Sequence, residues 1–244
     1  MNQEFPKIKP MGERAILVQF EPEISEVMLQ KVLFYKDKTE VFYDEVKVEV
    51  INTYNSLLIN YESYIEDVYG EVSALEKLFK NANIAETAEA RLFKLPVCYS
   101  SKLGPDMELI SSEKKMEPEE IIRLHSEAIY TVYFAGFLPG FLYLGGLDEK
   151  LHFPRKNEPR LKIEKGAVGI GGKQTGIYPK SSPGGWQIIG NCPVPVFVKN
   201  KLPPIEISAG DKIKFYPVSE AEFEKISEEI NTGKFNLKAE KYDG

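Results

Sequence analysis

The segment GAVGIGGKQTGIYPKSSPGGWQIIG, which runs from Gly166 to Gly190, constrains the fold of this chain more than any other stretch. It contains eight of the 18 glycines and the only tryptophan. Glycine loses more conformational entropy on folding than any other residue, so this density indicates tight turns, or a ligand or partner pressed close to the main chain. Ordinary loop chemistry is the alternative interpretation.

Strand fragments cut by glycine and proline surround this segment. Twelve of the 18 glycines fall between Gly136 and Gly190, and residues 205–219 read as a terminal hairpin or strand pair. Short strands with turn signals this frequent favour a closed or partly closed β-structure. Helices are expected in the same half of the chain at residues 103–112, at residues 118–130, where Pro118 suits a first turn, and at residues 221–230.

The N-terminal part shows a different pattern, in which strands and amphipathic helices alternate. The alternating run 14–20 predicts a strand, and apolar residues at helical spacing over residues 25–38 predict a helix with Ser25 as its N-cap. Strands at 46–51 and 56–61, a helix at roughly 65–81 and a strand from Arg91 follow. The resulting order, βαββαβ, is the ferredoxin-like arrangement.

Length and composition are those of a soluble globular protein. The 244 residues suit two modest domains or one large one. Hydrophobic residues make up 43% and charged residues 28%, and no run reaches the roughly 18 apolar residues of a membrane span. No secretory signal is visible, and Cys98 and Cys192 lie far apart and outside any C-x-x-C pair, which fits a reducing compartment. The cytoplasm is therefore the expected location.

The charge and the motifs exclude several classes of function. The chain has 31 basic and 37 acidic residues, a net charge of -6, and no basic stripe, which disfavours nucleic acid as a partner. Residues 172–173 match the second half of a phosphate-binding loop, but Ala167 and Gln174 break that motif, and no G-x-G-x-x-G is present. Neither His125 nor His152 belongs to a zinc motif, so no metal site is predicted. A small molecule or another protein is the expected partner.

Three groups of side chains are candidates for chemistry. Residues 134–147, FAGFLPGFLYLGGL, place aromatic and apolar residues beside glycines, which suits a contact surface or ordinary core packing. Arg155 and Arg160, each next to a proline, suit a solvated loop or a fork that holds a carboxylate or phosphate. His125 suits an ordinary helix position or a general base, and the sequence identifies no acidic group to orient it.

The chain resembles the family of the bacterial 5-oxoprolinase B subunit (PxpB) in a series of ordered blocks: LPVCY, GPD, EEIIRLHS, GFLPGFLYLGGLD, two PR pairs, GAVGIGGKQTGIYP and SPGGWQIIG. This family is also known as KipI-type kinase inhibitors or allophanate hydrolase subunit 1, and it is similar to one half of the carboxyltransferase region of urea carboxylase. The resemblance covers nearly the whole chain, since PMGERAILVQF near the start also fits the family. One departure is Leu142, which stands where a proline is expected.

The resemblance implies an α+β protein of two domains. Residues 1–92 are then a small ferredoxin-like α/β N-terminal domain, and residues 93–244 are a cyclophilin-like β-barrel domain with a short C-terminal helix. In this interpretation the glycines of residues 166–190 lie in turns of the barrel.

The resemblance also implies an activity, the ATP-dependent opening of the lactam ring of 5-oxo-L-proline to L-glutamate. The chain takes part in this hydrolase reaction together with partner subunits A and C, with ATP used at the level of the complex, and is expected to be inactive alone. Two alternatives stay open: inhibition of a sensor histidine kinase, and service as the carboxyltransferase half of a biotin-dependent urea or amide carboxylase.

Side-chain types within the resembling blocks suggest roles for eleven residues. A lactam hydrolase has to neutralise an oxyanion, hold the substrate carboxylate and exclude water. The expected catalytic residues are Gln174, Tyr178, His125 and Arg160; the expected substrate-binding residues are Arg155, Lys173 and Thr175; and the expected partner-binding residues are Phe137, Pro139, Phe141 and Trp186.

Overall fold

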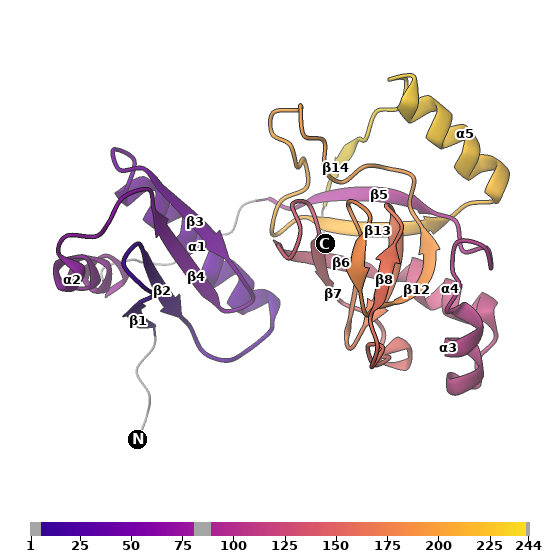
Figure 1. Ribbon diagram of the computed structural model, residues 1–244, viewed down its shortest axis with the longest axis horizontal. Coiled ribbons are helices and arrows are strands. Elements are labelled where there is room, and N and C mark those ends of the chain that lie inside the picture. The colour runs from indigo at the N-terminus through magenta and orange to yellow at the C-terminus, as the bar shows by residue number, and fades with distance from the viewer. Residues whose placement is uncertain (1–5, 81–88, 243–244) are drawn as a thin grey trace. The chain divides into compact units, whose positions relative to one another are not determined.

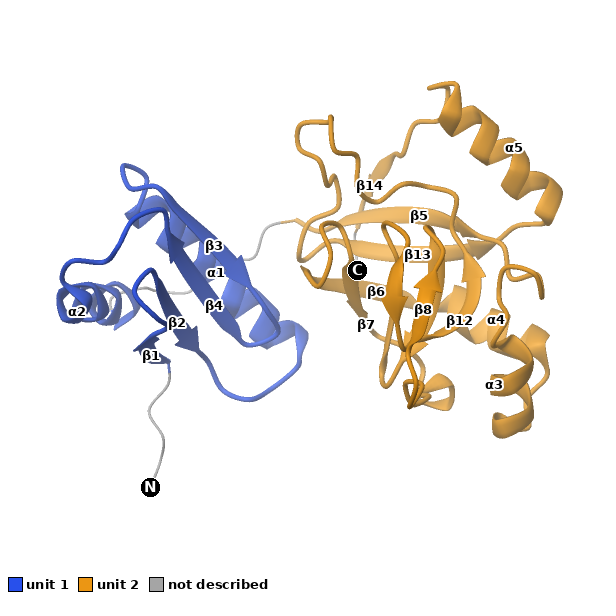
Figure 2. Ribbon diagram, in the orientation of Figure 1, with its two compact units in different colours: residues 1–88 blue, residues 89–244 orange. Residues whose placement is uncertain are grey.

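The chain folds into two compact units, residues 1–88 (unit 1) and residues 89–244 (unit 2), in a computed structural model that describes residues 6–80 and 89–242 (Figures 1 and 2). Both units combine helices with β-sheet, so the mixed α/β class predicted from the sequence is confirmed. Within the described ranges no helix is long and apolar enough to cross a membrane.

Unit 1 is a four-stranded antiparallel sheet with two helices. The strand order is β1-β2-β4-β3, and the predicted N-cap of the first helix is confirmed, because the Ser25 side chain accepts a hydrogen bond from the Met28 N–H at 3.1 Å. The elements are β1 (Lys7–Pro10), β2 (Ala15–Gln19), α1 (Glu26–Phe42), β3 (Val48–Asn52), β4 (Ser56–Tyr61) and α2 (Val68–Lys80).

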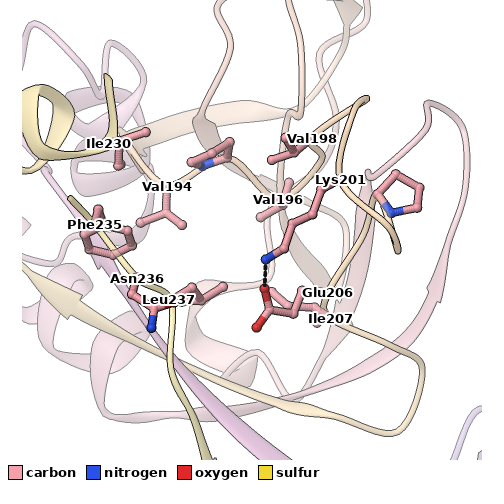
Figure 3. Close-up of a pocket in the computed structure, with 12 residues that line it drawn as sticks. Val194, Val196, Val198, Lys201, Glu206, Ile207, Ile230, Phe235, Asn236 and Leu237 are labelled. Atoms are coloured by element: carbon pink, nitrogen blue, oxygen red, sulfur yellow. Dashed lines mark hydrogen bonds and ion pairs between the residues drawn. The ribbon is translucent and has the colours of Figure 1, made fainter. Parts of the chain in front are cut away.

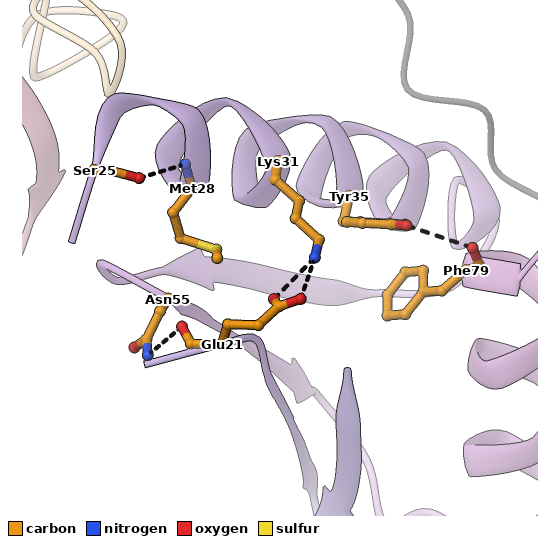
Figure 4. A network of polar contacts seen from close by, with 7 residues as sticks. All are labelled: Glu21, Ser25, Met28, Lys31, Tyr35, Asn55 and Phe79. Atoms are coloured by element: carbon orange, nitrogen blue, oxygen red, sulfur yellow. Dashed lines mark hydrogen bonds and ion pairs between the residues drawn. The ribbon is translucent and has the colours of Figure 1, made fainter. Parts of the chain in front are cut away.

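Alternation along the strands of unit 1 builds its core. Every second residue of β2 and β4, including Val18 and Leu57, is buried in the same apolar cluster as residues of both helices. Polar contacts lock α1 in place: Lys31 Nζ lies 2.8 Å from Glu21 Oε2, and the Tyr35 hydroxyl donates to the Phe79 carbonyl of α2 (Figure 4).

The strand that begins at Arg91 does not join the sheet of unit 1. This strand, β5 (Arg91–Val97), pairs in parallel with β13 (Lys212–Pro217) and antiparallel with β14 (Ala239–Lys241) in unit 2. The elements predicted over this region therefore occur in the predicted βαββαβ order along the chain, as β2, α1, β3, β4, α2 and β5, with β1 as an additional strand. The ferredoxin-like sheet that this order suggested is not formed by the described residues, because β5 pairs with strands of unit 2. The sequence of an apolar strand does not indicate which sheet it joins, so the order of elements along the chain does not assign a strand to a sheet.

Unit 2 contains an eight-stranded sheet of order β12-β9-β10-β7-β6-β13-β5-β14 and a separate pair, β11-β8. Strands β12 and β14 are its edges, and the edge strand β12 meets the end of β5 at a single bridge, where Cys98 and Asn191 exchange two backbone hydrogen bonds. In the part of the chain that the structure describes, the sheet therefore does not form the closed barrel that was expected. The further strands are β6 (Ile129–Ala135), β7 (Leu142–Gly145), β8 (Arg160–Ile163), β9 (Ala167–Gly171), β10 (Gln174–Ile177), β11 (Ser182–Gly184) and β12 (Gln187–Asn191).

The helices of unit 2 follow the sequence signals closely. Pro118 occupies the first turn of α4 as predicted, and a capping box between Ser219 and Glu222 begins the C-terminal helix. Only β13 forms where a hairpin or strand pair was expected at 205–219, since residues 205–208, before the turn at Gly210, are not in a strand. The helices are α3 (Met107–Lys114), α4 (Pro118–Glu127), the short 3-10 helix η1 (Glu149–Leu151) and α5 (Glu220–Asn231).

Candidate functional site

Strand β10 sends its predicted site residues to two opposite faces of the sheet. Thr175 and Ile177 point into the main core of unit 2, where both are fully buried. Gln174, Gly176 and Tyr178 alternate with them and point to the other face. That second face is covered by the indole of Trp186 and is called the Trp186 face below.

Strand glycines make room for the indole on this face. A Cβ atom at Gly171 would lie 2.5 Å from Trp186 Nε1, and Cβ atoms at Gly169 and Gly176 would each lie 3.2 Å from a Trp186 side-chain atom. In the block 166–190 only Gly166 and Gly172 have a positive φ, so the expectation that its glycines all lie in turns is wrong. Close approach of a side chain to bare strand backbone explains much of the glycine density.

An aromatic cluster surrounds the indole. The Phe141 ring meets Trp186 and Tyr178 edge-on, with centroid distances of 5.3 and 5.2 Å. Phe141 and Trp186 are 1% and 4% exposed, so neither forms part of the free surface that their expected partner-binding role requires. Burial of large aromatic rings competes with their use as contacts, and residue type alone does not separate the two.

The loop between β6 and β7 carries the exposed part of this cluster. Phe137 is 63% exposed and has a φ of 61°, a left-handed backbone that bulky residues rarely adopt. Its ring meets Phe141 edge-on at 5.7 Å, and Pro139, two residues further on, is also exposed. Phe137 and Pro139 are therefore accessible to a partner.

Arg155 places a positive charge on the Trp186 face. An antiparallel bridge between Phe153 and Gly172 sets this segment beside the turn that joins β9 and β10. The Arg155 guanidinium lies 5.5 Å from the centroid of the Trp186 ring, which is cation–π geometry, and the residue is exposed. Arg155 makes no ion pair within residues 6–80 and 89–242.

Two further predicted residues lie at the same turn. Lys173 is exposed, and Gln174 is half-buried on the face that carries the indole. The structure thus brings together Arg155, Gln174 and Tyr178 around Trp186, with Lys173 at the edge.

Arg160 already holds a carboxylate, which belongs to the protein. Its guanidinium donates two hydrogen bonds to Asp106, at 2.7 and 2.6 Å, and Lys156 Nζ lies 2.9 Å from the same carboxylate. The Ile188 N–H also donates to Asp106 at 2.6 Å. Arg160 therefore anchors the carboxylate of Asp106 in this structure.

Electrostatics around Asp106 stabilise its charged form. Burial alone raises the pKa of this 3%-exposed residue, but hydrogen bonds from Arg160, the Ile188 N–H and Lys156 outweigh burial and hold the pKa below its ordinary value. Asp106 and Lys156 were not among the predicted site residues. The helix N-cap position of Asp106 was the available signal, but it gave no indication of two distant cationic partners.

The Tyr178 hydroxyl lies among groups that stabilise negative charge. Burial raises its pKa, while the backbone N–H of Trp186 and the charges of Arg155 and Arg160 act in the opposite direction. Tyr178 is 2% exposed. The hydroxyl thus remains protonated at neutral pH.

His125 lies in the core and makes no contact with solvent. It is fully buried, Nδ1 lies 2.7 Å from the Tyr99 hydroxyl and Nε2 lies 2.9 Å from Thr175 Oγ1. Burial lowers the pKa of His125 to about 3, so the ring is neutral. Neither His125 nor the fully buried Thr175 is placed to touch a substrate, because the protein itself uses their polar atoms.

A mainly apolar pocket lies elsewhere in unit 2. A pocket of about 280 Å³ lies between the segment 194–207 and the chain that begins near the end of α5, and its charged groups are the ion pair of Lys201 and Glu206 (Figure 3). None of the eleven predicted site residues lines it. Across the described part of the chain, no group of three or more His, Cys, Asp or Glu side chains could hold a metal ion.

Comparisons with known proteins agree with one another. A family model described as the carboxyltransferase domain, subdomain C and D, matches residues 6–207. The 5-oxoprolinase B subunit of Bacillus subtilis is 36% identical over 241 residues, which cover 92% of this chain and 98% of that protein. The corresponding B subunit of Haemophilus influenzae is 39% identical over 208 residues, which cover 85% of this chain and 96% of that protein.

A solved structure gives the same assignment at the level of fold. The urea carboxylase of Kluyveromyces lactis superimposes with a TM-score of 0.79 at 22% identity, over 96% of this chain and 24% of that one. Together the matches define a carboxyltransferase-type domain of the C and D kind. The chain belongs to the family of 5-oxoprolinase B subunits.

Proposed function

We propose that this chain is the B subunit of an ATP-dependent 5-oxoprolinase, which opens the lactam ring of 5-oxo-L-proline to give L-glutamate together with partner subunits A and C. The proposal is supported by three relatives that carry the name of the 5-oxoprolinase B subunit and that this chain matches over 95% or more of their length. A cytoplasmic location is part of it, and two buried free cysteines, Cys98 and Cys192, are consistent with a reducing compartment.

The observation that carries the proposal in this structure is the Arg155 guanidinium over the Trp186 ring, beside Gln174 and Tyr178. The substrate is a small, flat ring with one carboxylate and one amide carbonyl. A guanidinium binds a carboxylate with charge-assisted hydrogen bonds, and the cation–π contact with Trp186 orients the exposed Arg155 for such a contact. Arg155 would therefore hold the carboxylate, and the Gln174 amide would donate to the carbonyl or phosphoryl oxygen.

The partner subunits are proposed to supply the activation of the substrate. A lactam is a resonance-stabilised amide, so its carbonyl needs activation before water can open the ring, and ATP use by the complex serves that step. The described residues 166–176 depart from a phosphate-binding loop at Ala167 and Gln174, so nucleotide binding is assigned to the complex and not to this chain. The exposed Phe137 and Pro139 are the proposed contacts with a partner subunit.

Substitution of Arg155 in the assembled complex tests the proposed binding role. Arg155→Met is expected to raise KM for 5-oxoproline about 10- to 100-fold, the effect of losing a hydrogen bond to a charged group, with a smaller change in kcat. Arg155→Lys should recover part of the loss. The matched control is Lys162→Met, which removes another exposed cation, 69% exposed, from the same unit and should leave KM unchanged. An unchanged KM in Arg155→Met would refute the role of Arg155.

A second candidate is carboxyl transfer to urea or another amide, which the match to a carboxyltransferase domain model favours. Purification from the native host separates the candidates. Two companion subunits with ATP-dependent glutamate release support the 5-oxoprolinase, a biotinylated companion supports carboxyl transfer, and a histidine kinase companion supports the inhibitor class.

A further inference from the structure

A chain of hydrogen bonds crosses the core of unit 2 and ends under the Trp186 face. The Tyr99 hydroxyl meets His125 Nδ1 at 2.7 Å, His125 Nε2 meets Thr175 Oγ1 at 2.9 Å, and Thr175 Oγ1 donates to the Gly169 carbonyl at 3.0 Å. Tyr99 follows β5, His125 belongs to α4, and Thr175 and Gly169 belong to the paired strands β10 and β9. Three separate parts of the fold therefore meet through one imidazole ring.

The chemistry of the partners fixes the direction of each bond. The Thr175 hydroxyl donates its single hydrogen to the Gly169 carbonyl, so it accepts from His125, and Nε2 carries the ring hydrogen. Because the ring is neutral, Nδ1 then accepts from the Tyr99 hydroxyl. Every polar hydrogen in this series of hydrogen bonds has an acceptor, so the network has one defined arrangement.

We infer that His125 is a positioning residue: through its Nε2–H bond to Thr175 it holds β10 in the register that presents Gln174 and Tyr178 on the Trp186 face. Thr175 lies between Gln174 and Gly176, and both of its neighbours face the indole while its own side chain faces His125. A rotation or shift of β10 therefore moves Gln174 relative to Arg155 and Trp186. Only the effect on catalysis rests on the proposed function.

The ring of His125 also packs in the core, and this contribution has to be separated from positioning. It stacks on Phe215 at a centroid distance of 4.8 Å and lies 5.5 Å from the Tyr130 ring. Any smaller side chain loses that packing. The test therefore compares two variants that both lose the ring but keep different hydrogen bonds.

His125→Gln and His125→Asn form that pair. Glutamine can place an N–H donor near the position of Nε2 and so keep the bond to Thr175, whereas asparagine reaches only to the position of Nδ1 and keeps the bond with Tyr99. Thr175→Ser, which keeps the hydroxyl, and Thr175→Val, which removes it, form a second pair. Thermal unfolding of all four full-length variants measures the loss of stability.

In the complex, kcat is expected to be about 10- to 100-fold lower in His125→Asn than in His125→Gln at similar unfolding temperatures, since a displacement near 1 Å at a reacting group has an effect of this size. Likewise, kcat should be lower in Thr175→Val than in Thr175→Ser. Equal kcat within each pair, or kcat that simply follows the unfolding temperature, would overturn the inference.

The single tryptophan provides a readout that does not depend on the reaction. Since β9 and β10 form the floor under Trp186, a shifted β10 changes the emission of folded Trp186 in His125→Asn and leaves it closer to wild type in His125→Gln. Identical emission in both variants would count against positioning. If the wild-type complex shows no 5-oxoprolinase activity, the proposed function fails, and the emission spectra still decide the role of His125.

Discussion

The fit of the indole against bare strands gives a sharp prediction for Gly171→Ala. A Cβ atom at this position would lie 2.5 Å from Nε1 and 2.6 Å from Cδ2 of Trp186, whereas carbon atoms in contact are normally about 3.5–4.0 Å apart. The indole would have to move by roughly 1 Å. Gly171 does not have a positive φ, so the penalty is steric and not a matter of backbone strain.

The size of the effect follows from the packing around the ring. Trp186 is 4% exposed and packs edge-on against Phe141 and Tyr143, so it has no free space to enter. Overpacking of a well-packed core costs about 1–3 kcal/mol, and the shortness of these contacts places Gly171→Ala near about 3 kcal/mol. For a unit of this size that corresponds to a fall of roughly 6–12 °C in unfolding temperature.

Denaturant and thermal unfolding followed by tryptophan emission measure this directly, because the only tryptophan lies at the site. Gly185→Ala is the matched control in the same block: its Cβ would make ordinary contacts of 3.5 Å or more, and its φ is not positive. This variant should be neutral or stabilise the protein by up to about 1 kcal/mol, since alanine restricts the unfolded chain. Equal stabilities of the two alanine variants would refute the explanation given for the glycines.

Two further predictions concern the ion pairs of Asp106 and the backbone at Phe137. Asp106→Asn should lower the free energy of unfolding by about 2–3 kcal/mol, because it leaves partly buried Arg160 and Lys156 without their carboxylate, and equilibrium unfolding measures the loss. The folded-state pKa of Asp106 lies below its ordinary value of 3.8, so its contribution to the free energy of unfolding is present above that value and is lost as pH falls through the folded pKa. The stability of Asp106→Asn should therefore fall less steeply on acidification than that of the wild type. An acid profile identical to that of the wild type would contradict this. Phe137→Gly should be more stable than Phe137→Ala by about 1 kcal/mol, since glycine adopts the left-handed backbone without strain, and the reverse order in thermal unfolding would contradict the strained loop.

The sequence predicted local structure well where one side chain controls it. Ser25 as an N-cap and Pro118 in a first turn are both in place, because capping and the fixed φ of proline act within a few residues. The sheet to which β5 belongs was not predictable in the same way. Its pairing with β13 sets Leu92 beside Lys212, its pairing with β14 sets Arg91 beside Lys241, and such distant partners leave no local trace.

The candidate site was predicted in part, and its errors have physical causes. Arg155, Gln174 and Tyr178 converge on the Trp186 face, as their residue types allowed. Arg160 pairs with the buried carboxylate of Asp106, which is distant in the sequence, and the type of residue at 160 does not reveal this partner. Thr175 and Gln174 are adjacent in sequence but face opposite sides of the sheet. The glycines of β9 and β10 have no side chains, so the alternation of apolar and polar residues that would show which side each residue faces is lost in the sequence.

The measurement that bears most directly on the proposed function is ATP-dependent release of glutamate from 5-oxo-L-proline by the partner subunits, assayed with and without this chain. We expect release only when the chain is present, and a marked loss at low substrate when Arg155→Met replaces the wild-type chain. Full release by the partners alone, or full release by this chain alone, would contradict its assignment as a required subunit.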